Sequence, residues 1–378
     1  MRTGPVDELR AMFNGARILV APLDWGLGHA ARCVPIIRAM QEQGAVPVIG
    51  GDKGPLALLR EEFPLLEQVS IPGMEVRYAK GRSQAWAMAK QFPTMLRQVP
   101  GEQRVFESLW RELRLDAVIS DQRFGIRAAG LPSVLITHQL FPFAPFAPFA
   151  QGVARRINRR HIDRFDLCWI PDHADPPGLS GALSHGKDIP GQARFIGPLS
   201  RFNDMRAARA DIHYRAVAVI SGPEPQRTLL EKSILEQLQK TEGSHLVVSG
   251  KPGSDDVQQG NIRTVGHLKA AALCTAMKNA ELIISRTGYS TLMDLDAIGR
   301  GALLVPTPGQ PEQEYLGRLH RQAGLHCIQE QHGLDLAAAF HNPPGLSLSP
   351  QKTSALLPAI SELARLIIQR RNANLSHA

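Results

Sequence analysis

Cysteine is scarce in this sequence, and none of it is paired. The four cysteines lie far apart along 378 residues and form no Cys-x-x-Cys pair; they are Cys33, Cys168, Cys274 and Cys327. This spacing excludes a disulfide framework and a standard zinc site. It also favours a reducing compartment, where thiols stay free.

Long apolar runs are missing as well. No stretch approaches the roughly 18 unbroken apolar residues that a membrane-spanning helix needs. Residues 1–17 contain acids and no long apolar core, so we expect no signal peptide. Apolar residues make up 43% of the chain and charged residues 21%, which is typical of a folded protein. We therefore expect a soluble, cytoplasmic protein, with two domains as the default at about 100–200 residues each.

Positive charge is in excess, with a formal net charge of +8. This balance suits nucleic acid, an anionic membrane surface or phosphorylated substrates, and it does not choose among them. The apolar, proline-broken segment 141–150 precedes five arginines in residues 154–164. Aromatics beside a basic helix can dock on anionic lipid at the inner membrane face and admit a lipid-linked acceptor. A buried loop followed by a solvated basic helix explains the same residues equally well.

Apolar strand-like runs alternate with helical patterns in both halves of the chain. The runs predict strands at 17–23, 45–51, 66–71, 116–121, 133–139, 165–172, 215–220, 244–250, 261–267, 280–288 and 301–309. This order predicts the α/β class, with two Rossmann-like, doubly wound parallel-sheet domains whose carboxyl strand ends face a cleft. We place the N-terminal acceptor-binding domain at 1–197 and the C-terminal nucleotide-sugar domain at 198–349, with a hinge at 190–204. A last helix, within 350–378, is expected to return to the N-terminal domain.

The loop "DWGLGH" connects the first predicted strand to a helix. A helix N-terminus with free backbone N–H groups attracts anions, and Gly26 and Gly28 would let a ligand approach closely. The loop is neither a dinucleotide fingerprint, which needs a third glycine, nor a P-loop, which needs Gly-Lys-Ser/Thr. The alternative is a plain turn in which His29 caps the helix.

Two loops in the second half repeat this geometry. "SRTGYST" follows a strand and opens a helix, which predicts phosphate contacts from Arg286, Gly288, Tyr289, Ser290 and Thr291. "SGPEPQR" also follows a strand and opens a helix, which predicts phosphate contacts from Ser221 and Arg227. Simple N-capping by Ser290 or Thr291 explains one loop alone. Three such loops, each at the carboxyl end of a strand, together favour a ligand site.

The pair Asp294 and Asp296 forms an Asp-x-Asp pattern inside a predicted helix. Side chains two residues apart on a helix point about 200° apart, so these two cannot chelate one ion. We therefore predict no metal.

These motifs resemble the GT-B glycosyltransferases, in particular the lipid II-forming UDP-N-acetylglucosamine transferase family of glycosyltransferase family 28. That family has a glycine-rich loop ending in Gly-His, as "GLGH" does here. Its second domain carries an Arg-Ser-Gly turn, a helix with an acidic residue, a Val-Pro strand end and a glutamine-rich segment. Residues 285–316 follow the same order.

The resemblance implies roles for individual residues. It assigns Asp294 to the donor ribose, Gln313 and Glu314 to the donor sugar, and Ser221 to the diphosphate. It also implies that backbone in "TVGHL" reads the uracil base, which covers Gly266, His267 and Leu268. The family has glutamine where this chain has Glu314 and usually glutamate where it has Asp294. We therefore expect a relative with another acceptor and a UDP-linked donor, whose sugar is either N-acetylglucosamine or a different one. The nucleotide sugar would be a substrate, and no further cofactor is implied.

Sugar transfer needs a base for the acceptor hydroxyl and stabilisation of the departing diphosphate. His29 is the first candidate base, because an imidazole titrates near neutral pH. Asp121, at the end of a predicted strand, is the second. His138, also at a strand end, is the third and lies on the acceptor side. The alternative for each is a hydrogen-bonded loop residue, and only the glycine-loop setting favours His29 over that alternative.

Two other classes of function fit the same features. Nucleotide-sugar 2-epimerases share the architecture and use no acceptor. A non-enzymatic protein could bind nucleic acid through the arginine-rich segment, but no nucleic-acid module is recognisable, so we expect no nucleic-acid partner.

Overall fold

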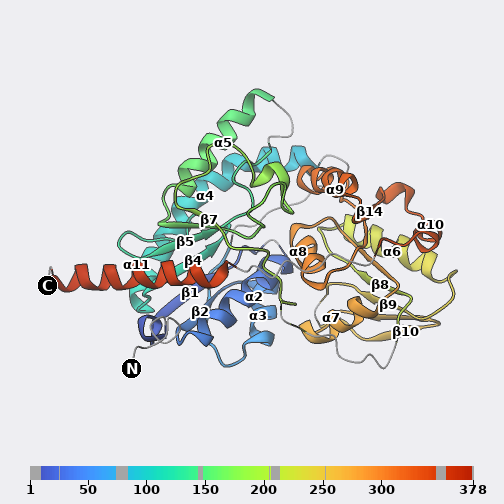
Figure 1. Ribbon diagram of the computed structural model, residues 1–378, viewed down its shortest axis with the longest axis horizontal. Coiled ribbons are helices and arrows are strands. Elements are labelled where there is room, and N and C mark those ends of the chain that lie inside the picture. The colour runs from blue at the N-terminus through green and yellow to red at the C-terminus, as the bar shows by residue number, and fades with distance from the viewer. Residues whose placement is uncertain are drawn as a thin grey trace. The chain divides into compact units, whose positions relative to one another are not determined.

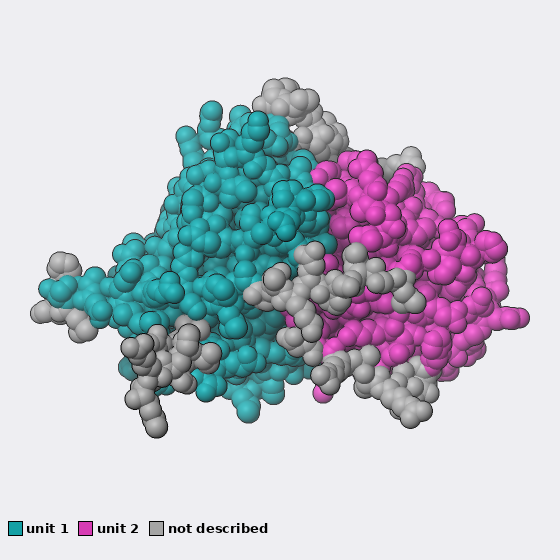
Figure 2. All heavy atoms as spheres, viewed as in Figure 1, with its two compact units in different colours: residues 1–76, 90–199, 352–378 teal, residues 77–89, 200–351 magenta. Residues whose placement is uncertain are grey.

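The computed structural model describes residues 10–24, 26–73, 84–143, 148–203, 205, 213–251, 253–345 and 355–376. The chain divides into two compact units, coloured separately in Figure 2. Unit 1 comprises residues 1–76, 90–199 and 352–378, and unit 2 comprises residues 77–89 and 200–351. Each unit is an α/β domain built on its own seven-stranded sheet.

The sheet of unit 1 has the order β3-β2-β1-β4-β5-β6-β7, and all its strands are parallel. The strands are β1 (Arg17–Ala21), β2 (Val46–Gly51), β3 (Gln68–Ser70), β4 (Ala117–Asp121), β5 (Ser133–Ile136), β6 (Leu167–Ile170) and β7 (Ala193–Phe195). The strand order reverses between β1 and β4. Ligands of doubly wound sheets bind at the carboxyl ends of the strands beside such a reversal.

Helices cover this sheet, as Figure 1 shows. They are α2 (Leu27–Glu42), α3 (Lys53–Glu62), α4 (Gln84–Glu112), α5 (Pro148–Ile162) and α11 (Leu356–Ser376). Because β4, β5 and β6 are buried along their whole length, their residues are mostly apolar and do not alternate with polar ones; the polar exceptions lie at strand ends, Ser120 and Asp121 in β4 and Ser133 in β5. Residues of α2, β1 and β4 such as Ile37, Leu19 and Val118 are fully buried.

The last helix belongs to unit 1, as the sequence predicts. Arg371 Nη2 lies 2.8 Å from Asp116 Oδ1, just before β4, and Arg370 Nη2 lies 3.3 Å from Asp166 Oδ1, just before β6. Ile360 and Leu363 of the same helix are fully buried. The C-terminus therefore adds a layer to the first domain although the second domain separates the two in sequence.

The sheet of unit 2 has the order β10-β11-β9-β8-β12-β13-β14. The strands are β8 (Ala216–Val219), β9 (His245–Val248), β10 (Val257–Gln259), β11 (Ile262–Val265), β12 (Leu282–Ser285), β13 (Leu303–Leu304) and β14 (Cys327–Ile328). All are parallel except β10, which pairs with β11 as an antiparallel edge strand. The order reverses between β8 and β12, so this sheet too is doubly wound.

The helices of unit 2 are α6 (Gln226–Leu238), α7 (Ala270–Asn279), α8 (Tyr289–Ile298), α9 (Pro311–Ala323) and α10 (Leu336–His341). A cluster of fully buried residues from strands and α6, including Ala216, Ile234 and Ile284, fills the space below α6 and α10. Within the described part of the chain, no helix is both long and apolar enough to cross a bilayer.

Candidate active site

The carboxyl ends of β1 and β4 carry the polar cluster of unit 1. After β1 the chain turns at Gly26, whose φ of 135° lies in the region that favours glycine. Gly26 is the N-cap of α2, and it makes no side-chain capping bond. The alternative that His29 caps this helix is therefore wrong, because its Nδ1 lies 2.9 Å from Asp121 Oδ2 instead. Gly28 lies in the first turn of α2.

Asp121 binds two side chains of α2 at once. It ends β4 and is fully buried. Arg32 donates from Nε to Asp121 Oδ2 at 2.8 Å and from Nη2 to Asp121 Oδ1. Because His29 and Arg32 are three residues apart on a helix, both reach the same carboxylate. Two of the three predicted bases therefore form one hydrogen-bonded group, joined by an arginine that the sequence analysis missed.

The electrostatics of this group follow from burial and from Arg32. Burial, followed by the charge of Arg32, lowers the pKa of His29, although Asp121 acts in the opposite direction. Burial acts to raise the pKa of Asp121, but Arg32 and His29 outweigh it, so that the pKa is lowered. The ring of His29 keeps 21% of its surface exposed, whereas Asp121 has none. His29 is therefore the member of the pair that a ligand can reach.

His138, the third predicted base, lies just after β5. Its Nδ1 is 3.4 Å from Arg32 Nη1, so it adjoins the same cluster. It is buried, and its backbone carbonyl accepts a hydrogen bond of 2.8 Å from Ser184 Oγ. The structure therefore brings His29, Asp121 and His138 to one edge of the sheet.

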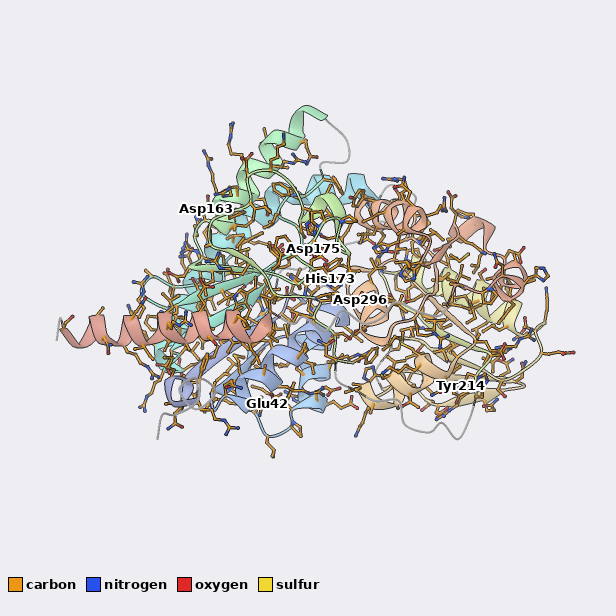
Figure 3. All side chains as sticks on the ribbon, viewed as in Figure 1. Glu42, Asp163, His173, Asp175, Tyr214 and Asp296 are labelled. Atoms are coloured by element: carbon orange, nitrogen blue, oxygen red, sulfur yellow. The ribbon has the colours of Figure 1, made fainter. Side chains whose placement is uncertain are left out.

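A fourth strand end was not predicted to matter. Asp172, which follows β6, is fully buried and accepts backbone bonds from His173, Leu179 and Ser180. Figure 3 labels His173 and Asp175 in this loop. Burial acts to raise the pKa of Asp172, but its hydrogen bonds lower it on balance. Asp172 therefore fixes the loop whose Ser184 holds the carbonyl of His138.

In unit 2, Arg286 has a structural role that the sequence does not predict. Its guanidinium is fully buried and donates from Nη2 to Gln226 O and Gln331 Oε1, both at 2.7 Å. Nη1 donates to the carbonyls of Val305 and Pro306. Burial lowers its pKa to about 10. Through Nη1 and Nη2, Arg286 ties together the ends of neighbouring strands, and its contact with a phosphate stays a prediction.

Arg227 is likewise occupied. Its Nη2 donates to Glu224 Oε1, and its Nη1 donates to the carbonyl of Ser249 at 3.0 Å. The adjacent turn contains Ser221, which is half-buried, and Gly222, which has a φ of 105°. A Cβ at Gly222 would lie 3.8 Å from Arg286 Nε, so this turn packs directly over the buried guanidinium.

Helix α8 begins at Tyr289 with Gly288 as its N-cap. The alternative of N-capping by Ser290 or Thr291 is therefore wrong, because both residues lie within the first turn. Tyr289 is buried, while Ser290 and Thr291 are partly exposed.

Further along α8, Asp294 accepts a hydrogen bond of 2.5 Å on Oδ1 from Ser200 Oγ. Burial raises its pKa to about 6. Asp296, labelled in Figure 3, lies two residues on. No group of three or more His, Cys, Asp or Glu side chains in the described ranges could hold a metal ion.

The remaining predicted donor residues lie in the first turn of α9, which holds Gln313 and Glu314, and in the loop after β11. Gln313 Oε1 accepts from Thr307 N at 2.9 Å, and Glu314 Oε1 accepts from Gly309 N at 2.8 Å, so both side chains hold the loop after β13. A Cβ at Gly266 would lie 2.2 Å from the carbonyl of Lys251, which only glycine avoids. The residues that follow it, His267 and Leu268, are half-buried.

Unit 2 is similar in sequence to a known protein family. Residues 217–335 match the glycosyltransferase family 28 C-terminal domain. The UDP-N-acetylglucosamine–N-acetylmuramyl-(pentapeptide) pyrophosphoryl-undecaprenol N-acetylglucosamine transferase of Methylorubrum extorquens strain PA1 is 28% identical over 142 residues, or 33% of this chain. The match spans only 38% of that relative's length. The protein of the same name from Bradyrhizobium sp. strain BTAi1 is 25% identical over 272 residues, which are 66% of this chain and 67% of the relative.

Solved structures share the fold. The glycosyltransferase of kitacinnamycin has a TM-score of 0.58 at 13% identity and covers 96% of this chain and 99% of its own. SnogD from Streptomyces nogalater has a TM-score of 0.54 at 16% identity, with 94% and 96% covered. The spinosyn rhamnosyltransferase SpnG has 0.56 at 17% identity, also with 94% and 96% covered. Residues 217–335 of unit 2 thus match the glycosyltransferase family 28 C-terminal domain, and the chain has the GT-B fold of these glycosyltransferases.

Proposed function

We propose that this protein transfers a sugar from a UDP-linked donor to an acceptor hydroxyl, with inversion and without a metal. The observation that carries the proposal is the hydrogen-bonded group of His29, Asp121 and Arg32 at the strand-order reversal of unit 1. It occurs in a chain whose unit 2 carries a glycosyltransferase family 28 domain.

His29 would act as the general base. When Nδ1–H of His29 donates a hydrogen bond to Asp121, Nε2 carries a lone pair that can take the proton of an acceptor hydroxyl. The acceptor oxygen then bonds to the anomeric carbon from the face opposite the diphosphate. The bond from that carbon to the diphosphate oxygen breaks, and the electron pair leaves with the diphosphate. Proton transfer at this position typically contributes about 10²–10⁴-fold to the rate.

The donor would bind to unit 2. The N-terminus of α8 and the turn at Ser221 suit the diphosphate, because the N-terminus of a helix attracts anions. Asp294 lies about one helical turn from that N-terminus, where a carboxylate can accept from ribose hydroxyls. The backbone at Gly266 to Leu268 would contact uracil. The relatives' names include UDP-N-acetylglucosamine, which supports this donor over others.

The acceptor would be a lipid or glycan of the cell envelope. The relatives' names include a pyrophosphoryl-undecaprenol acceptor, which is lipid-linked. On α5, Arg155, Arg156 and Arg160 are exposed, and Arg155 lies over the ring of Phe141 at 5.5 Å. Exposed arginines beside an aromatic suit an anionic membrane surface, so we propose a peripheral, cytoplasmic location. Residues 144–147 of the predicted apolar segment lie outside the described residues.

The test is a ligand screen followed by a product assay. UDP and UDP-N-acetylglucosamine should raise the melting temperature more than ADP, GDP or TDP; a ligand at about 100 times its dissociation constant stabilises by about 2.7 kcal/mol. Incubation with UDP-N-acetylglucosamine and a polyprenyl diphosphate-linked sugar should release UDP, and excess EDTA should leave the rate unchanged. Turnover that EDTA abolishes and Mg²⁺ restores would contradict the metal-free mechanism. Epimerisation of the donor without any acceptor would replace the transferase proposal with an epimerase.

A further inference from the structure

Arg32 is a buried cation at the site in unit 1. Only 2% of its surface is exposed. Its Nε and Nη2 both donate to Asp121, its Nη2 lies 2.8 Å from His29 Nδ1, and its Nη1 lies 3.4 Å from His138 Nδ1. One guanidinium therefore touches all three groups that the sequence predicts as bases.

The hydrogen-bonding capacity of these groups limits the arrangement. A guanidinium only donates, and an ionised carboxylate only accepts. His29 Nδ1 faces one of each, at 2.8 and 2.9 Å. The carboxylate concentrates its charge on two oxygens, whereas the guanidinium spreads its charge over three nitrogens and already binds both of those oxygens. The proton on Nδ1 is therefore best placed toward Asp121, which leaves the lone pair on Nε2.

The charges of the group decide whether His29 takes up a second proton. Arg32 and Asp121 carry opposite charges and cancel, so the group is neutral while the imidazole is neutral. A proton added to His29 would leave one uncompensated positive charge at a largely buried site, directly beside a guanidinium. Without Arg32, the same proton would create a neutral ion pair with Asp121.

We propose that Arg32 is a positioning residue, which orients Asp121 as the acceptor for His29 Nδ1 and keeps the imidazole uncharged so that Nε2 can accept a proton. Its action on the acceptor hydroxyl rests on the proposed function, whereas its action on His29 does not. The other groups that face His29 are Asp121 from β4 and His138 from the end of β5. Cys33 of α2 lies near Asp121 and Arg32 and stays a neutral thiol, because burial raises its pKa.

The unmodified protein provides the first test. Two-dimensional NMR of protein with 15N-labelled histidine correlates the ring nitrogens with the carbon-bound ring protons and distinguishes the two neutral tautomers. Comparison with the spectrum of His29→Asn assigns the His29 signals. We expect the tautomer with its proton on Nδ1 and a pKa of His29 below its ordinary value. A proton on Nε2, or an ordinary or raised pKa of His29, would overturn the proposal. This test needs no substitution in the site of the protein that is measured.

Substitution of Arg32 provides the second test. Arg32→Gln should raise the pKa of His29 above that of the unmodified protein, because Asp121 is then free to stabilise the imidazolium. Arg32→Lys keeps a cation but cannot form the two-pronged contact with Asp121, so the pKa of His29 should stay low. The matched control is Arg38→Gln on the same helix, where Arg38 Nη2 pairs with Glu62 Oε2 at 2.9 Å. An unchanged pKa of His29 in Arg32→Gln would refute the role of its charge.

The kinetic profile separates positioning from simple stabilisation. In Arg32→Gln the acidic limb of kcat/KM should move to higher pH, which a general loss of folded protein would not produce. In Arg32→Lys the limb should stay in place while kcat falls, by up to about 100-fold, because a small displacement of a catalytic group can cost that much. If Arg32→Gln does not fold, the tautomer of His29 in the unmodified protein and the pH profile of Arg32→Lys still decide whether Arg32 positions His29. Absence of any glycosyl transfer would remove the proposed function and leave the NMR result to stand alone.

Discussion

Ser200 Oγ donates a 2.5 Å hydrogen bond to Asp294 Oδ1, so the first residue of the 200–351 segment occupies one oxygen of the carboxylate that we assign to the donor ribose. A ribose hydroxyl would need the same oxygen or its neighbour. Under the proposed role of Asp294, the hydroxyl of Ser200 therefore competes with the ribose of the nucleotide for this carboxylate.

Removing that hydroxyl should make UDP bind more tightly. In Ser200→Ala, Asp294 no longer has to give up a hydrogen bond when a ribose arrives, so we expect a dissociation constant for UDP about two- to tenfold lower, within the worth of one such bond. Isothermal titration calorimetry measures it, with Ser361→Ala on α11 as the control. Weaker binding in Ser200→Ala would mean that Ser200 supports the nucleotide instead of competing with it.

Asp294→Ala should weaken UDP binding by roughly 10–100-fold, because charge-assisted hydrogen bonds are worth about 1.5–3 kcal/mol. The loss should depend on the 2′-hydroxyl: dUDP should bind less well than UDP to the unmodified protein and equally well to the variant. Calorimetry of both ligands completes the double-mutant cycle. Asp296→Ala is the control on the same helix. Equal losses at both positions would remove Asp294 from the ribose site.

The ionisation of Asp294 should appear in stability against pH. Burial raises its folded pKa from 3.8 to about 6, so its contribution to stability is complete below pH 4 and is lost as the pH rises past 6. Asn keeps an oxygen for the Ser200 hydroxyl and has no charge. The melting temperature of Asp294→Asn relative to the unmodified protein should therefore increase between about pH 5 and pH 7.5. A difference that is the same at both pH values would contradict the raised pKa.

His29→Ala should lower turnover by roughly 10²–10⁴-fold and change the affinity for UDP much less, because the base acts only in the chemical step. Steady-state release of UDP and calorimetry of UDP give the two quantities. His341→Ala, an exposed histidine at the end of α10, serves as the control. Turnover close to that of the unmodified protein would exclude His29 as the base.

Arg286→Met should destabilise the protein by at least about 3 kcal/mol, because the four acceptors that its guanidinium satisfies would be left unpaired in the interior. Arg286→Lys should not restore stability, since one ammonium cannot reach acceptors on several segments. Arg227→Met is the matched control, expected to cost no more than about 1 kcal/mol, because Arg227 pairs with the exposed Glu224. Thermal unfolding of the three variants measures these changes. A stable Arg286→Met with weakened UDP binding would restore the direct phosphate role.

The sequence by itself determined the features that arise from nearby residues. Apolar runs that alternate with helical patterns specify two α/β domains, because a strand buried on both faces is mostly apolar, as the Ala-Val-Ile run of β4 and the Val-Leu-Ile run of β5 are. The turn at Gly26 and the start of α8 at Tyr289 are also local, since a strand that runs into a glycine and then into a helical pattern has few other conformations. Asp121 and His138 could be chosen because each stands at the carboxyl end of a predicted strand, and His29 because it ends the glycine loop that follows one.

Only the tertiary structure decided which of these residues meet. His29 and Asp121 are 92 residues apart and come together because β4 pairs with β1 in the sheet, which periodicity does not reveal. Arg32 was missed for the same reason: on a helix facing solvent it would be an ordinary cation, and its role depends on the carboxylate that the sheet order brings beneath it. Arg286 shows the converse, since a local pattern typical of phosphate binding lies under the Gly222 turn, where burial directs the guanidinium to carbonyl groups of the protein itself.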